Sequence, residues 1–208
     1  MSFLVLPVLT KRSVNTVSIP LLVHPSSEVM MRRLFLSTLT LVAMLPGAAQ
    51  AQSDAALIQS ALSAAPASVS DSATVVDSQG RVVRQGTNGW VCMPDDPQVP
   101  NNSPMCLDAP WREFMDAFMN KRTPSFSGVG FGYMLQGDFP VSNTDPFATA
   151  PAPDNHWVPD SGPHVMMIAS DARLLEGLPT DPKNGGPWVM WKDTPYAHVM
   201  IPATSPQR

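Results

Sequence analysis

The strongest periodic pattern in the chain predicts an amphipathic helix that begins near Asp108 and Pro110. Trp111, Phe114 and Phe118 repeat at helical spacing together with two methionines, and charged residues occupy the other side. A shorter helix is expected from Ala55 to Ala65, with Ser53-Asp54 as its cap and Pro66 directly after it. A third, very short helix is expected over residues 171–176.

Short apolar runs separated by turn-forming residues predict strands. Residues 73–77 and 81–85 flank Ser78-Gln79-Gly80, and this arrangement is typical of a hairpin. Residues 188–191 and 196–201 flank Lys192-Asp193-Thr194-Pro195 in the same way. Further strands are expected over residues 90–93, 125–136, 163–169, 188–191 and 196–201. Helices and strands are intermixed without regular βαβ alternation. The pattern therefore predicts a compact α+β domain with a mainly antiparallel sheet and two or three short helices.

Residues 128–132 alternate glycine with larger side chains and continue into Tyr133-Met134-Leu135. They lack the Gly-x-Gly-x-x-Gly spacing of a dinucleotide-binding loop, so a strand is the better interpretation. A strand face made of glycines lets a helix, an aromatic ring or a ligand approach the backbone closely. We expect a helix or an aromatic ring there.

Residues 31–51 have the three parts of a Sec-type secretory signal peptide. Two arginines precede an apolar run, and Ala49-Gln50-Ala51 supplies the small residues that predict cleavage after Ala51. Residues 1–30 have no place in such a leader, and we interpret them as an extension from a misassigned start codon; a long, unusual leader is the alternative. The apolar run is shorter than the roughly 20 residues of a membrane-spanning helix. We expect residues 52–208 to form a single periplasmic or secreted domain with no membrane contact after cleavage.

The charge of residues 52–208 indicates an acidic domain. This part contains nine Lys and Arg residues and sixteen Asp and Glu residues. A surface of net negative charge repels phosphate backbones, so we do not expect a nucleic-acid partner. The long irregular stretch over residues 137–162 is unusual for an idle loop and suggests a functional or packed segment.

The only cysteines, Cys92 and Cys106, fall within the predicted exported part. In an oxidising compartment two such cysteines are expected to form a disulfide. Closing the loop between them would stabilise the fold by about 3 kcal/mol. A metal or redox role is the alternative, but there is no Cys-x-x-Cys spacing and no neighbouring histidine.

Several segments together resemble a group of uncharacterised secreted bacterial proteins that carry Cys, His and Pro signatures. The resemblance covers roughly residues 74–202 and implies export and a similar fold, but no activity is established for that group. No functional residue can be carried over from it. The matching segments are Gly86–Cys92, Pro104–Asp108, Gly137-Asp138, Ser142–Pro146, Gly162–Met166, Gly185–Trp191 and Thr194–Met200.

The sharpest candidate for a site is a near-duplication, His164-Val165-Met166 and His198-Val199-Met200. Residues two apart share one face of a strand, so each histidine points the same way as its methionine. If the strands meet, two imidazoles and two thioethers converge, and this ligand set suits copper, above all Cu(I). The alternative is structural: methionine fills irregular cores well, and such a histidine often binds a backbone carbonyl.

The sequence leaves two classes of function open. We expect a ligand-binding or interaction module, with metal binding through the His/Met pattern as one form of it. The alternative is a hydrolase-like periplasmic enzyme that uses His164 or His198 with an aspartate of the long loop. No hydrolase motif is present, and no catalytic residue is assigned. The loop candidates are Asp138, Asp145, Asp154, Asp160 and His156.

Overall fold

The structure is a computed structural model that describes residues 46–203. The predicted upstream extension and most of the predicted signal peptide lie outside the described residues. Within residues 46–203, no helix is both long enough and apolar enough to cross a membrane.

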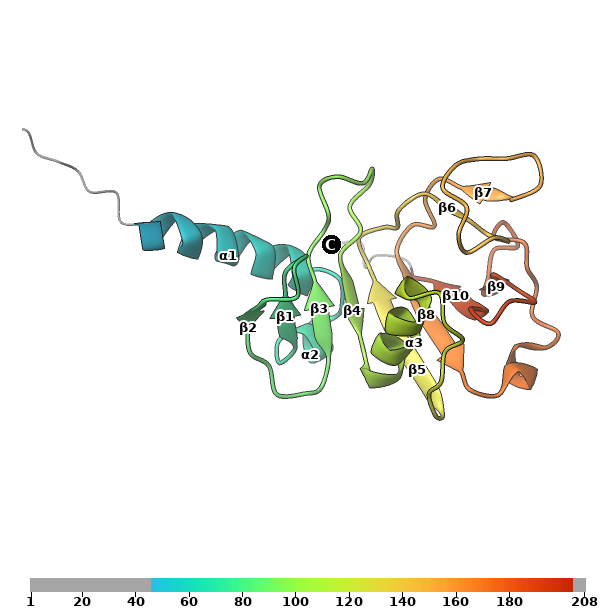
Figure 1. The fold of residues 1–208 in the computed structure, drawn as a ribbon, viewed down its shortest axis with the longest axis horizontal. Coiled ribbons are helices and arrows are strands. Elements are labelled where there is room, and N and C mark those ends of the chain that lie inside the picture. Colours follow the sequence, from blue (N-terminus) through green and yellow to red (C-terminus); the bar gives the residue numbers. More distant parts are fainter. Residues whose placement is uncertain (1–45, 204–208) are drawn as a thin grey trace, which may run out of the picture. The chain divides into compact units, whose positions relative to one another are not determined.

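An eight-stranded sheet forms the centre of the fold (Figure 1). Its strand order is β2-β1-β3-β4-β5-β8-β10-β9, and all neighbours are antiparallel except the parallel pair β1 and β3. This confirms the predicted α+β fold and its mainly antiparallel sheet. The strands are β1 (Thr74–Val76), β2 (Val82–Arg84), β3 (Val91–Met93), β4 (Met105–Leu107), β5 (Val129–Met134), β8 (His164–Ala169), β9 (Trp188–Met190) and β10 (His198–Pro202). A separate two-stranded sheet pairs β6 (Val141–Ser142) with β7 (Trp157–Val158).

The helix α3 (Ala109–Met119) confirms the helical periodicity predicted from residue 108 onward. The side chain of Asp108 accepts a hydrogen bond from the backbone N–H of Trp111 at 2.9 Å, and Pro110 occupies the first turn. Two shorter elements complete the helical part: α2 (Ala67–Ser70) and the 3₁₀ turn η1 (Ala172–Leu175).

The boundaries predicted for the first helix were wrong. The helix α1 spans Pro46–Leu62, so it begins before the expected cap at Ser53-Asp54 and ends before Ala65. Proline is tolerated in the first turn of a helix, where its missing N–H is not needed. Asp54 lies inside the helix, and its carboxylate forms an ion pair with Arg81 at 2.8 Å.

The helices α1 and α3 cover opposite faces of the sheet. On β4, Leu107 belongs to the core cluster of Trp111 from α3, whereas its neighbour Cys106 belongs to the cluster of Ala61 from α1. The glycines of β5 face α3, because a Cβ at Gly130 would lie only 2.8 Å from Cβ of Pro110. The predicted close approach of a helix to this glycine face is therefore confirmed.

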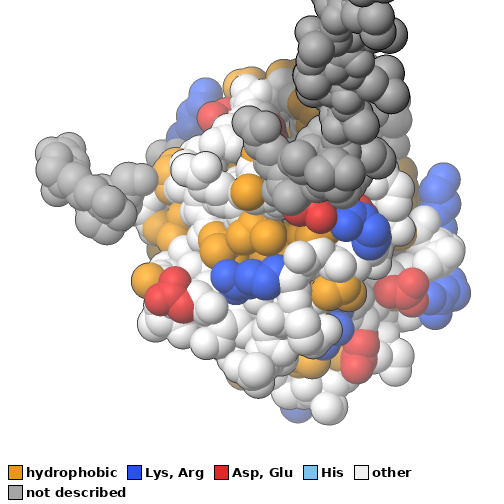
Figure 2. Space-filling view, turned by 90° about the vertical axis from the view of Figure 1, so that its left-hand side faces the viewer, with side chains coloured by type: hydrophobic (Ala, Val, Ile, Leu, Met, Phe, Trp, Pro, Cys, Tyr) orange, Lys and Arg blue, Asp and Glu red, His pale blue; other side chains and the backbone are white. Residues whose placement is uncertain are grey.

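Cys92 and Cys106 form the predicted disulfide, and no other cysteine is present. The two residues are direct partners across the antiparallel pair β3 and β4, and both are fully buried beneath α1. The surface around this core carries apolar side chains as well as charged ones (Figure 2).

Candidate functional site

A cavity of about 620 Å³ lies between the sheet and α3, on the face opposite α1. Strands from both halves of the sheet contribute to its wall, from Val76 on β1 to Met190 on β9. The loop that joins β3 to β4 also lines it, through Pro94, Val99 and Ser103. The volume lies within the range of ordinary small-molecule sites, about 300–1,000 Å³.

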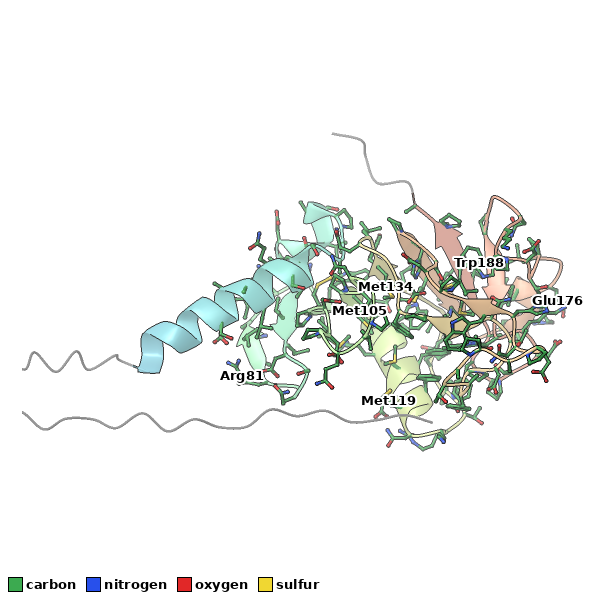
Figure 3. The ribbon with its side chains drawn as sticks, turned by 90° about the horizontal axis from the view of Figure 1, so that it is seen from above. Arg81, Met105, Met119, Met134, Glu176 and Trp188 are labelled. Atoms are coloured by element: carbon green, nitrogen blue, oxygen red, sulfur yellow. A yellow bond between two sulfur atoms is a disulfide. The ribbon has the colours of Figure 1, made fainter. Side chains whose placement is uncertain are left out.

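Methionines dominate the wall of this cavity. Of the nine methionines in the described part of the chain, eight line it, and the ninth, Met167, lies on the other face of β8. Figure 3 shows Met105 and Met134 close together, whereas Met119 lies farther away at the end of α3. Thioether side chains are flexible and polarizable, which suits an adaptable binding surface. The eight are Met93, Met105, Met115, Met119, Met134, Met166, Met190 and Met200.

Trp191 enters the same wall through an unusual backbone conformation. Successive strand residues normally face opposite sides of a sheet, yet Met190 and Trp191 both line the cavity. Trp191 has a φ of +54°, in the left-handed region, which ends β9 and redirects the ring. The indole Nε1–H donates to the carbonyl of Ser142 at 2.8 Å and holds the ring in place.

His198 is the one histidine among the cavity-lining residues. Its Nδ1 lies 3.0 Å from the carbonyl oxygen of Tyr196, and its ring packs against Trp191 and Trp111 with centroid distances of 4.9 and 5.5 Å. Because a carbonyl only accepts, Nδ1 carries the proton, and the lone pair of the neutral ring is on Nε2. Burial lowers the pKa of His198 to about 4, so the ring is neutral near pH 7.

Acidic side chains collect at one edge of the cavity. Asp77 follows β1, Asp96 lies three residues after β3, and Asp138 follows β5, and all three line the cavity. The strands β1, β3 and β5 run in the same direction, so their carboxyl-terminal ends lie on the same side of the sheet. No Lys or Arg of the described chain lines the cavity.

Asp138 and His164 form a buried pair at this edge. His164 is fully buried, and its Nδ1 lies 2.7 Å from the carbonyl oxygen of Gly162. Its Nε2 has no hydrogen-bond partner among the described residues and lies 4.0 Å from Oδ2 of Asp138. Burial raises the pKa of the Asp138 carboxyl, and the neighbouring His164 opposes this in part.

No protein family model matches this chain, and neither the curated proteins nor the solved structures contain a significant match to it. The resemblance to secreted bacterial proteins therefore stays a prediction.

The four residues predicted as a metal site are divided between different surroundings. Met166 and Met200 are direct partners in the β8–β10 pairing and both line the cavity with His198. His164 instead faces Asp138. The Cε atom of Met166 packs closely on β5, because a Cβ added at Gly132 would lie only 2.8 Å from that atom. Residues 46–203 contain no group of three or more His, Cys, Asp or Glu side chains that could hold a metal ion. Copper binding stays a prediction.

Among the loop candidates, only Asp138 lines the cavity. Asp145 accepts a hydrogen bond from the N–H of Phe147 at 2.9 Å and so forms an Asx turn. Asp160 lies behind Asp138 and accepts its backbone N–H at 3.2 Å. Asp154 and His156 are exposed and do not reach the cavity.

The sequence reasoning missed six of the eight cavity methionines and Trp111 as site residues. The alternation of side chains along each strand contained the information needed to place the methionines on the cavity face. Met93 and Met105 each occupy the face of their strand opposite the cysteine next to them, and Met134 shares the face of the β5 glycines. Only the strand order shows that these faces join into one surface.

Proposed function

We propose that this protein is an exported ligand-binding protein that holds an elongated apolar ligand in the methionine-lined cavity. The observation that carries the proposal is the gathering of eight of nine methionines, with Trp111 and Trp191, around one cavity. Ligand pockets are mostly apolar with a few placed polar groups, and His198 and Asp138 are such groups here. Methionine lets the wall adapt to the shape of a flexible chain.

The direction of the cavity supports an elongated ligand. The lining runs from Val76 on β1 to Met190 on β9, which are six strand positions apart in the sheet. At about 4.8 Å between neighbouring strands, this corresponds to roughly 29 Å across the sheet. An extended hydrocarbon chain lying across the strands fits such a space better than a compact, rounded molecule.

Export is the second part of the proposal. The buried disulfide supports a protein that works outside the reducing cytoplasm. The predicted cleavage site after Ala51 falls inside α1. Intact mass spectrometry of the exported protein tests it: the mature chain should begin at Gln52, and a first residue upstream of Met44 would contradict the proposal.

Ligand binding is favoured over catalysis because of where the reactive groups lie. The enzyme alternative has one supporting observation, the 4.0 Å approach of His164 to Asp138. However, His164 is fully buried and does not line the cavity, so a bound ligand would not reach its Nε2. His198 does line the cavity, but its hydrogen bond is to a backbone carbonyl and not to a loop aspartate.

A fluorescent apolar probe tests the proposed function. N-phenyl-1-naphthylamine should gain fluorescence on binding the wild-type protein in a saturable way. Met105→Trp should weaken this binding at least tenfold because the larger ring fills the cavity. Phe131→Trp is the matched control, since Phe131 lies on the other face of β5 and is 40% exposed. Equal probe affinity in the two variants would contradict the proposal.

A soft metal ion is a second candidate for the same wall. His198 and Met190 are direct partners between β10 and β9, and Met200 lies two residues along on the same face. The Nδ1–H bond to Tyr196 leaves Nε2 free, as in metal-binding histidines that donate their other N–H to a carbonyl. A thioether and imidazole set suits Cu(I).

Anaerobic titration with Cu(I) against a competing chelator tests this second candidate. Met200→Leu should weaken Cu(I) binding at least tenfold. Met167→Leu, on the other face of the sheet, should leave it unchanged. If wild-type protein does not compete with the chelator, or both variants bind alike, the candidate is wrong.

A further inference from the structure

We infer that the ligand carries a protonated amine at one end and that this group lies at the acidic edge of the cavity, beside Asp96 and Asp138. The inference rests on the proposed function and names the chemical class of the ligand. It makes the protein a binder of cationic amphiphiles and not of fatty acids.

The charges that line the cavity are all of one sign. Asp77, Asp96 and Asp138 line it, and no Lys or Arg of the described chain does. Asp77 is already paired, because Arg81 Nε lies 2.8 Å from its Oδ2. Asp96 and Asp138 have no such cation, so a ligand carboxylate placed at this edge would meet like charge and no counter-ion.

Within the described residues, no Lys or Arg forms an ion pair with Asp138. It is only 4% exposed, and its carboxyl Oδ1 accepts the N–H of Phe139 at 2.8 Å. The nearest basic group is the Nε2 of His164, which is 4.0 Å away and makes no hydrogen bond to it. Asp160, directly behind, adds further negative charge. Burial without a cation favours the neutral form of such a carboxyl, and a ligand ammonium would stabilise its charged form through an ion pair.

The part of the cavity away from the acidic edge is apolar, and this determines which end of the ligand lies where. Beneath α3 the wall consists of Trp111, Phe114, Met200 and their apolar neighbours, with His198 as the polar exception. The hydrocarbon part of an amphiphile would lie there, where burying apolar surface is favourable. The amine would remain at the edge formed by the ends of β1, β3 and β5.

Three probes of equal chain length test the inference: dodecylamine, dodecanol and dodecanoate. Each is used below its micelle concentration, near neutral pH, to displace N-phenyl-1-naphthylamine from wild-type protein. We expect dodecylamine to bind at least tenfold more tightly than dodecanoate, with dodecanol between them. Like charge at a partly desolvated edge disfavours the carboxylate, and opposite charge favours the amine.

Variants identify the groups that recognise the amine. Asp138→Asn should lower the affinity for dodecylamine to that for dodecanol, and the exposed Asp96→Asn should lower it by a smaller factor. Asp154→Asn is the matched control because it removes the same charge from an exposed position outside the cavity. Its affinities should equal those of wild type.

The possible failures are distinguishable. If the protein binds none of the three compounds, the proposed function itself is wrong. If dodecanoate binds as tightly as dodecylamine, the inference is overturned while the apolar cavity remains a binding site. If Asp154→Asn loses as much affinity for dodecylamine as Asp138→Asn and Asp96→Asn do, general surface charge explains the preference, and the inference is also overturned.

Discussion

The imidazole of His198 is tied to the backbone of Tyr196: Nδ1 lies 3.0 Å from the carbonyl oxygen, two residues earlier in the chain. This bond fixes the tautomer and leaves Nε2 as the acceptor on the cavity side. Burial among aromatic rings lowers the pKa of His198 and keeps the ring neutral in the folded protein, although the hydrogen bond to Tyr196 opposes this shift in part. This relationship has a direct consequence for stability against acid.

The first prediction is that His198 makes the protein sensitive to mild acid. Its folded pKa of about 4 lies below the value of 6.5 for an ordinary histidine. Between these values the unfolded chain binds a proton that the folded chain does not, so the free energy of unfolding falls as pH falls. The full effect of this one group, from about pH 6.5 to about pH 4, is roughly 3 kcal/mol.

Urea unfolding of wild type and His198→Phe across this pH range measures the effect. The variant should lose the part of the pH dependence that belongs to His198, whereas His156→Gln, at an exposed position, should keep it. Parallel pH curves for wild type and His198→Phe would show that the ring titrates normally and contradict the prediction.

The second prediction concerns Asp138 and has the opposite sign. Burial raises its pKa above 3.8, so over the interval above that value the folded protein holds a proton that the unfolded chain has lost. The free energy of unfolding contributed by this group therefore falls as pH rises through that interval. Asp138→Asn should remove this fall and be more stable than wild type near neutral pH. A variant less stable than wild type at every pH would argue against a strained carboxyl.

The third prediction is that the glycine face of β5 tolerates no side chain. A Cβ at Gly130 would lie 2.8 Å from Pro110 Cβ and 2.9 Å from Ile168 Cγ1. Gly130→Ala should therefore cost about 1–3 kcal/mol of unfolding free energy, because such overpacking displaces α3 or β8. Phe131→Ala is the control on the exposed face, and thermal unfolding compares the two. A Gly130→Ala variant as stable as wild type would mean that α3 is not packed tightly on β5.

The fourth prediction is that the disulfide is a structural element. Reduction of Cys92–Cys106 should lower the free energy of unfolding by about 3 kcal/mol, because the unfolded chain regains the freedom of the closed loop. Urea midpoints with and without a reductant measure it, and a Cys92→Ala/Cys106→Ala variant should not respond to reductant. If reduction leaves the wild-type midpoint unchanged, the pair contributes nothing to stability.

The features predictable from the sequence depend on local patterns. The helix α3 follows from its periodic apolar face and the Asp108 cap, and the disulfide follows from two cysteines in a predicted exported domain. The hairpin of β9 and β10 follows from two apolar runs around a turn. In each case the residues that decide the structure are neighbours in the chain or few in number.

The cavity depends on relationships that no local pattern contains. Met93, Met134 and Met190 meet the same space only because β5 lies beside β8 and β10 separates β8 from β9. The ring of Trp191 joins them through a left-handed backbone conformation, which the sequence does not signal. Of the predicted His/Met set, Met166, His198 and Met200 line this wall. His164 does not, because it faces Asp138, whereas His198 packs against the aromatic rings beneath α3.

The most direct test of the proposed binding site is a methyl NMR titration of the methionines with dodecylamine. The methyl resonances of methionines along the cavity, from Met105 to Met200, should shift together and saturate, while Met167 on the other face of β8 should not move. Unshifted cavity methionines, or a response in Met167 as large as theirs, would contradict ligand binding in this cavity.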